Sequence, residues 1–229
     1  MNFIKQETFR ITKQDFIYSS IYYDVIFDVL HANELVSENN LAEKFGCSRT
    51  PVREAIGKLI QDNILVSIPQ QGTYVTPIKI ENADEAIFVR SLIEPTILVK
   101  AIDHITDKDL LELKKIIDDH ESFYKKEDFV SSFVMDIKFH EYFYKICNYQ
   151  KTFDSIERIS SDSYRIRFLK LKNNYRWDGT LNEHLHLLNL IVDKNRDELY
   201  ENVLQHILNC YVDTKSLLEK YSDYFVTKH

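Results

Sequence analysis

The sequence predicts a mainly α-helical protein in two parts, an N-terminal helix-turn-helix with a β-hairpin and a C-terminal, all-α antiparallel bundle. Three observations lead to this prediction. Only 4 glycines and 4 prolines occur in 229 residues, which fits helices better than many tight turns. Two short β-branched runs follow three helical stretches near the N-terminus, and the apolar residues beyond them recur at helical spacing. The domain boundaries that we expect are 1–77 for the first domain, 78–82 for a linker, 83–221 for the helical domain and 222–229 for a tail.

The first 62 residues are expected to form three helices. Apolar spacing predicts the first helix over 18–33 and the second over 37–44. Ser48 is a good N-cap residue and Pro51 suits the first turn of a helix, so the third helix begins there and reaches about Asp62. A helix-turn-helix is the arrangement that this order favours.

A β-hairpin and a series of helices complete the predicted fold. Residues 64–68 and 73–76 are β-branched runs around a loop that ends at Gly72, which is typical of a hairpin. No strand pattern follows. The helices expected after the linker cover 83–104, 107–126, 128–147, 150–171, 180–194 and 196–221.

The chain has the features of a protein of the reduced cytoplasm. No apolar run reaches the roughly 18 residues that a membrane span needs, and the N-terminus has no apolar stretch typical of a secretory signal. Cys47, Cys147 and Cys210 are too far apart for a disulfide framework or a paired metal motif. We therefore expect a cytoplasmic protein with no membrane partner.

The net charge excludes a protein that binds nucleic acid through a generally basic surface. The formal charge is −7 at pH 7. Residues 1–80 hold 8 Lys and Arg against 9 Asp and Glu, and residues 81–229 hold 21 against 27. Binding to DNA therefore needs a locally concentrated group of cations, while the acidic remainder repels phosphates and suppresses non-specific binding.

The start of the third helix carries such a group. In a helix-turn-helix, the second helix presents its N-terminal residues to base edges in the major groove. Arg49 and Arg53 are four residues apart and share one helix face, and each suits bidentate contact with guanine or phosphate. Ser48 and Thr50 can bind phosphate beside the N–H groups of the helix start, and Lys44 adds charge. The alternative is an exposed helix with solvated side chains, but the ordered turn, cap and hairpin favour DNA binding.

Four residues of the helical part have the types and spacing of a metal site. Asp136 and His140 lie four apart on one helix, offset by about 40°, and His184 and His206 lie on later helices. Three neutral imidazoles and a carboxylate suit Zn²⁺, Ni²⁺ or another late transition metal. The chain has 8 histidines, so a buried, hydrogen-bonded histidine is the alternative for each of them. His186 points about 200° away from His184 on a helix and is assigned to the surface or to packing against a neighbour.

Both parts resemble known families. The run LAEKFGCSRTPVREAI at 41–56, followed by GTYV at 72–75, resembles the winged helix-turn-helix of the GntR superfamily of transcription regulators. Residues 83–221 resemble the helical FCD ligand-binding domain of the FadR-like branch, in its shorter, VanR-like form. The matching pieces are VRSLIE at 89–94, DIKFH at 136–140, CN at 147–148, EH at 183–184 and HI at 206–207.

The resemblance implies a homodimer that binds a short palindromic operator in double-stranded DNA. Arg49, Arg53 and the wing glycine Gly72 would approach the DNA. Asp136, His140, His184 and His206 match the one Asp and three His through which many members bind a divalent metal. The sequence departs from the family in two places: residues 33–36 lack the usual Gly and Pro of the first turn, and Asn39 stands where an arginine is common. The operator of relatives therefore does not carry over to this chain.

The effector that the resemblance implies is a small organic acid. Arg90 is the best residue to bind its carboxylate, because a guanidinium keeps its charge and can bind two oxygens. The alternative for Arg90 is an ion pair with Glu94, four residues on. Arg165 is a further candidate on a later helix, as is Arg167.

The sequence therefore predicts a DNA-binding transcription regulator, a repressor by preference, whose operator affinity depends on a carboxylate metabolite at the metal site. One rival is a regulator for which the metal itself is the signal. Another is a metal-dependent helical enzyme. An enzyme is disfavoured because Glu141 and Glu183, the acids nearest to the ligands, are helix neighbours that point about 100° away from them.

Overall fold

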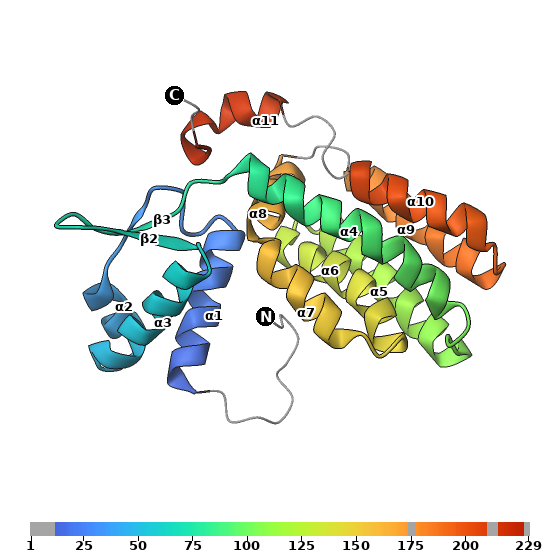
Figure 1. Ribbon diagram of the computed structural model, residues 1–229, viewed down its shortest axis with the longest axis horizontal. Coiled ribbons are helices and arrows are strands. Elements are labelled where there is room, and N and C mark those ends of the chain that lie inside the picture. The colour runs from blue at the N-terminus through green and yellow to red at the C-terminus, as the bar shows by residue number, and fades with distance from the viewer. Residues whose placement is uncertain (1–11, 174–176, 210–214, 227–229) are drawn as a thin grey trace. The chain divides into compact units, whose positions relative to one another are not determined.

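The computed structural model describes residues 12–173, 177–209 and 215–226 (Figure 1). The chain forms two compact units. The N-terminal unit holds the described residues up to Ile80 together with those from Lys215 onward, and the helical unit begins at Glu81. The mainly helical fold and the small sheet that the sequence predicts are confirmed.

Three helices build the N-terminal unit, namely α1 (Lys13–Ile26), α2 (Glu38–Lys44) and α3 (Arg49–Gln61). Helix α3 packs against α1 and α2, and its buried face carries Val52, Ala55, Ile56 and Leu59. The helix expected over 18–33 was wrong in both boundaries. Thr12 caps α1 by accepting the Asp15 N–H, so the helix begins earlier. It ends earlier because Asp28 takes a left-handed conformation at φ 56°.

A three-stranded antiparallel sheet in the order β1-β3-β2 completes this unit's winged helix-turn-helix. Its strands are β1 (Leu35–Val36), β2 (Leu65–Ile68) and β3 (Gly72–Val75). Strands β2 and β3 form the expected hairpin. Strand β1 pairs Leu35 with Tyr74, where the sequence indicated only a short turn. The sheet therefore joins the first turn of the unit to its wing.

The C-terminal segment of the chain also belongs to this unit. It comprises helix α11 (Lys215–Lys220) and the 3₁₀ turn η1 (Ser222–Tyr224), and it ends in a parallel bridge between Ile78 and Phe225. The sequence predicts 215–221 as part of the helical domain and the residues after it as a tail. The segment lies in the N-terminal unit because the hydrogen bonds that hold it are long-range ones to Asn33 and Ile78.

Seven helices form the helical unit over the part of the chain that the structure describes. They are α4 (Ile80–Ala101), α5 (Asp107–Lys125), α6 (Phe129–Ile146), α7 (Gln150–Ile159), α8 (Ser161–Lys172), α9 (Trp177–Val192) and α10 (Arg196–Asn209). Helix α6 packs against α5, α7 and α8, and α9 packs against α5 and α10 (Figure 1). The single helix expected over 150–171 is interrupted at Ser160. Of the helix expected over 196–221, the structure describes α10 up to Asn209 and α11 from Lys215, and residues 210–214 lie outside the described residues. None of the helices in the described ranges is long and apolar enough to cross a membrane.

Candidate metal centre and DNA-binding surface

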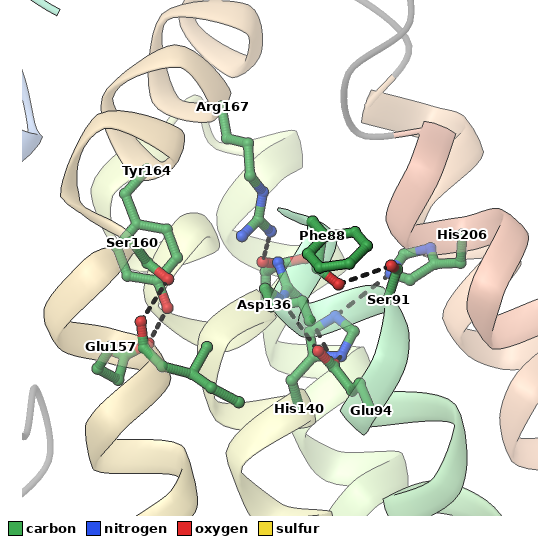
Figure 2. A network of polar contacts seen from close by, with 12 residues as sticks. Phe88, Ser91, Glu94, Asp136, His140, Glu157, Ser160, Tyr164, Arg167 and His206 are labelled. Atoms are coloured by element: carbon green, nitrogen blue, oxygen red, sulfur yellow. Dashed lines mark hydrogen bonds and ion pairs between the residues drawn. The ribbon is translucent and has the colours of Figure 1, made fainter. Parts of the chain in front are cut away.

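Three helices bring the ligand atoms of the three predicted histidines within 4.8 Å of one another inside the helical unit, with Asp136 beside His184. Helix α6 supplies Asp136 and His140, α9 supplies His184, and α10 supplies His206. All four side chains are buried. The Nε2 atom of His206 lies 3.3 Å from the Nε2 atoms of both His184 and His140. Figure 2 shows the side chains of His140 and His206 facing each other, with Asp136 beside them.

Aromatic packing holds the imidazoles in this arrangement. The spacing of four residues places Asp136 and His140 on the same buried face of α6. The ring of Phe139 stacks on the ring of His184, with centroids 4.2 Å apart and planes at 22°. The rings of His140 and His206 stack with centroids 5.2 Å apart. The site is therefore shaped by the core of the bundle.

Two carboxylates contact the Nδ1 atoms of His206 and His140. Glu183 Oε2 is 2.6 Å from His206 Nδ1, and Glu94 forms a close ion pair with His140 Nδ1. A histidine whose Nδ1–H donates to a carboxylate keeps a lone pair on Nε2, which is the usual arrangement around a bound metal. His140 and His206 therefore each turn an acceptor atom toward the same point.

The donor set fits a divalent cation. One oxygen of Asp136 pairs with Arg167, while Oδ1 has no hydrogen-bond partner among the described residues and lies 3.7 Å from His184 Nε2. Three imidazole acceptors and a carboxylate oxygen that converge in a buried place repel one another unless a cation or a proton lies between them. Three histidines and one aspartate are ligands that Zn²⁺ and related late transition metals prefer.

Burial and neighbouring charges set the protonation states that metal binding needs. Burial lowers the pKa of His140, and burial together with the neighbouring His206 and His140 places the pKa of His184 well below its usual range. Burial opposes ionisation of Asp136, but the Arg167 guanidinium and the nearby histidines hold its pKa low. Neutral imidazoles and an ionised carboxylate are the forms that bind metal ions.

A small cavity adjoins this centre and is lined by both polar and apolar side chains. Its lining residues are Arg90, Glu94, Ile137, His140, Tyr144, Phe153, Ile156, Glu157, Tyr164 and Arg167. Arg90 Nε lies 2.9 Å from Glu94 Oε2, so the predicted ion pair forms, and Arg90 also borders the cavity. Burial raises the pKa of Glu157 to about 8, and the Tyr164 hydroxyl donates to this carboxyl (Figure 2).

The second predicted effector residue, Arg165, does not line this cavity. Arg165 is buried, and its Nη1 atom lies 3.4 Å from Asp162 Oδ1. Arg167, two residues further on, lines the cavity and forms an ion pair with Asp136. Sequence reasoning could not choose between them because helix α8 is buried on all sides from Asp162 to Leu171. Such a helix has no polar face from which its rotation can be read.

Two further residues, Glu94 and His120, lie at this centre, although the sequence did not indicate them as part of it. Glu94 was considered only as a partner of Arg90, although it contacts His140 as well. His120 is fully buried on α5, with its ring centroid 5.8 Å from that of His184, and burial lowers its pKa to about 4. Its position in the 3.6-residue apolar pattern of α5, beside Ile116 and Ile117, was the available signal.

In the N-terminal unit, the exposed start of α3 presents the predicted DNA-binding residues. Arg49 is its first residue, and Ser48, Arg49 and Thr50 are all exposed. The Ser48 backbone is extended, as an N-cap requires, yet its side chain makes no capping hydrogen bond. The Ser48 hydroxyl therefore does not occupy the N–H groups of the helix start, which leaves them available to an anion at this exposed end of α3.

The other cations of this surface are paired with acids. Arg53 Nε lies 3.0 Å from Glu38 Oε2, and Lys44 Nζ lies 2.8 Å from Asp24 Oδ2. Because Arg53 is paired with Glu38, Arg49 offers the more available guanidinium of the two on α3.

Gly72, the predicted wing residue, has a structural reason to be glycine. Its φ is 133°, and a Cβ atom would lie 2.7 Å from Leu35 Cδ1.

Comparison with known proteins finds the same two parts. The family described as bacterial regulatory proteins, gntR family, matches residues 13–75, and the FCD domain matches residues 85–209. The HTH-type transcriptional repressor RspR of Escherichia coli is 23% identical over 209 residues, which cover 91% of this chain and 92% of that protein. The E. coli regulator McbR is 34% identical over 89 residues, 39% of this chain and 40% of that protein.

Solved structures share the fold. E. coli McbR/YncC superposes with a TM-score of 0.75 at 20% identity, covering 92% of this chain and 99% of the other. A GntR regulator from Rhodococcus sp. RHA1 gives a TM-score of 0.67 at 17% identity, covering 91% and 98%. Both likenesses extend over the winged helix and the helical unit.

Proposed function

Since this chain belongs to the GntR family of DNA-binding transcription regulators, with an FCD domain after its winged helix, we propose that it is a metal-dependent repressor controlled by a small carboxylate. Its relatives are regulators rather than enzymes. The observation that supports the metal-dependent part is the convergence of three buried imidazole Nε2 atoms beside Asp136 Oδ1, which has no hydrogen-bond partner among the described residues.

In this proposal, Asp136, His140, His184 and His206 would hold Zn²⁺ or Ni²⁺. The bound cation would supply Lewis acidity toward a carboxylate oxygen. Glu94 and Glu183 orient His140 and His206 through their Nδ1 atoms. Such carboxylate partners raise the basicity of the ligand and fix its tautomer.

The charges around the cavity favour an anionic effector. Arg90 and Arg167 both border it, and Glu157 is largely protonated at neutral pH because burial raises its pKa to about 8. A divalent cation at the histidines would leave this region with more positive than negative charge. An effector carboxylate would compete with Glu94 for Arg90 and thereby change the packing of α4 against α6, which carries His140.

DNA binding is assigned to the exposed start of α3, presented twice by a homodimer. Half-sites one helical turn apart require two recognition helices at a fixed spacing. Phe88 and Leu92, four residues apart on α4, are 63% and 56% exposed, an apolar pair that a second copy of the chain would cover. A change in the helical unit that alters this pairing would change operator affinity.

Native mass spectrometry of gently purified protein, with elemental analysis, tests the assembly and the metal together. We expect a dimer that carries one Zn²⁺ or Ni²⁺ per subunit. An operator can then be obtained by selection from a random duplex library. The repressor proposal predicts that a panel of small carboxylates weakens binding of the metal-loaded protein. If added metal alone switches binding and no acid does, the metal is the signal instead.

A further inference from the structure

The C-terminal segment 215–226 lies outside both family matches, which end at residues 75 and 209, yet it is bound to the N-terminal unit. The Ile78 N–H donates to the Tyr224 carbonyl at 2.7 Å, and the Val226 N–H donates to the Ile78 carbonyl at 3.0 Å. Phe225 is buried between these two bonds. We refer to residues 215–226 as the docked segment.

The docked segment also reaches the turn that leads into β1. The Asn33 side chain donates from Nδ2 to the Asp223 carbonyl at 2.8 Å, and the rings of His31 and Tyr224 are 5.9 Å apart. Leu217 of α11 is fully buried. Because β1 pairs with β3, which forms the wing with β2, the docked segment is anchored to the sheet that carries the wing.

At the other end of the same stretch of chain, one carboxylate links a metal ligand to the end of α10. Glu183 Oε2 lies 2.6 Å from His206 Nδ1, and Glu183 Oε1 accepts a hydrogen bond from Asn209 Nδ2 at 3.2 Å. His206 lies one turn before Asn209, the last residue of α10. The position of the His206 ring and that of the helix end are therefore set by the same side chain.

We propose that the docked segment transmits the effect of metal binding at the three histidines to the N-terminal unit, which carries the winged helix-turn-helix. This proposal rests on the proposed function, because it takes His206 to be a metal ligand. Only five residues, 210–214, separate Asn209 from the docked segment. The DNA-binding unit thus has two covalent connections to the helical unit, one through residues 76–80 and one directly from the helix that carries His206. A shift at the end of α10 acts on the docked segment without passing through α4.

Hydrogen–deuterium exchange of the full chain, read by mass spectrometry, tests this route. The protein is compared with Zn²⁺ alone and with a chelator. We expect Zn²⁺ to slow exchange in α9 and α10, and also at Ile78 and in the docked segment. If α9 and α10 respond but Ile78 and the docked segment do not, the proposal is overturned and the metal site stands. If α9 and α10 do not respond either, the metal site fails and the proposal fails with it.

Two variants separate the route from a general change in stability. Val226→Pro removes the N–H that bonds to Ile78, and the extended Phe225 backbone already suits a following proline. We expect about fivefold faster exchange at Ile78, with the Zn²⁺ response kept in α9 and α10 and lost at Ile78. Val226→Ala, at a side chain that is 45% exposed, is the matched control and should leave both responses unchanged.

Asn209→Ala tests the other end of the route. It removes the link from Glu183 to the helix end and leaves the docked segment's own bonds in place. Ile78 should remain protected in this variant, but its response to Zn²⁺ should fall at least twofold. An unchanged response at Ile78 in both Asn209→Ala and Val226→Pro would overturn the proposal.

Discussion

Arg53 on the recognition helix is bound by Glu38 on the preceding helix, with Nε 3.0 Å from Oε2. The pair is largely exposed, so its contribution to stability is small. We expect its effect on DNA binding to be larger, because a phosphate that contacts Arg53 would compete with Glu38 for the guanidinium.

Glu38→Gln should therefore strengthen binding to DNA of any sequence. The change releases Arg53 and removes a negative charge from the surface, so we expect a several-fold gain in affinity and a salt dependence steeper by about one phosphate contact. Fluorescence anisotropy over a salt series measures both quantities. Glu43→Gln changes the same charge on the same helix and is the control. Equal effects of the two variants would mean that release of Arg53 has no part in the gain.

Arg49→Ala should abolish specific operator binding while leaving the fold intact. Arg49 is exposed at the start of α3, so its loss costs little stability, whereas a lost base contact costs about 1–3 kcal/mol of binding free energy. Arg49→Lys keeps the charge but loses the bidentate geometry, so it should retain non-specific binding only. A gel-shift assay with the selected duplex and with a scrambled duplex checks this, and unchanged specific binding would refute the role of Arg49.

His184→Ala should remove the bound metal. His184 is fully buried in the centre, while His186, two residues on in the same helix, is exposed and serves as the matched control. We expect a loss of metal stoichiometry and of the rise in Tm that Zn²⁺ gives to the wild-type protein, because a ligand stabilises the folded state to which it binds. Elemental analysis and thermal unfolding with and without a chelator test this. His186→Ala should match the wild type in both.

Leu92→Glu should convert the protein to a monomer. The leucine is 56% exposed and lies one turn from Phe88 on α4, so a charge there would be buried against the second copy. Size-exclusion chromatography with light scattering gives the mass. Leu111→Glu, at a leucine of α5 that is 72% exposed, is the control. A dimer in both variants would exclude this face of α4 from the interface.

Glu157 should make the protein less stable as pH rises. Its pKa is about 8 when folded and about 4.5 when unfolded. Between these values the folded form keeps the proton and the unfolded form releases it, so the free energy of unfolding falls by up to about 1.4 kcal/mol per pH unit. The contribution of Glu157 to the free energy of unfolding is therefore greatest below pH 4.5, and its loss is complete above about pH 8. Glu157→Gln, compared with wild type by urea unfolding with chelator at several pH values, should remove this slope. Parallel curves for the two proteins would contradict the prediction.

The sequence predicted the elements that have strong local signals. The N-cap at Ser48 and the β-branched runs around Gly72 located α3 and the wing. Strand β1 was missed because two residues are too few to show an alternation, and it exists through pairing with β3. The end of α1 depends on Asp28 at a positive φ, which the apolar pattern does not reveal.

Of the four candidate ligands, Asp136 and His140 share a helix face through their spacing of four residues, but the set of four was recognisable only through the resemblance to the FCD domain. The residues that form ion pairs with these ligands were not recognisable from the sequence. Each such pair joins residues far apart in the chain, as with Arg167 and Asp136 or Glu94 and His140. The pairing of Arg53 with Glu38 spans two helices and is equally invisible to a count of charges.

The docking of residues 215–226 on the first 80 residues makes the N-terminal unit discontinuous in the chain. A ribosome synthesises domains in order, and the first domain usually folds first. Here the hydrogen bonds of Ile78 cannot form until Tyr224 and Val226 have been synthesised. The DNA-binding unit is therefore completed only after the whole helical unit has been translated. A nascent or prematurely terminated chain that stops before residue 215 would lack the docked segment and its hydrogen bonds to Ile78.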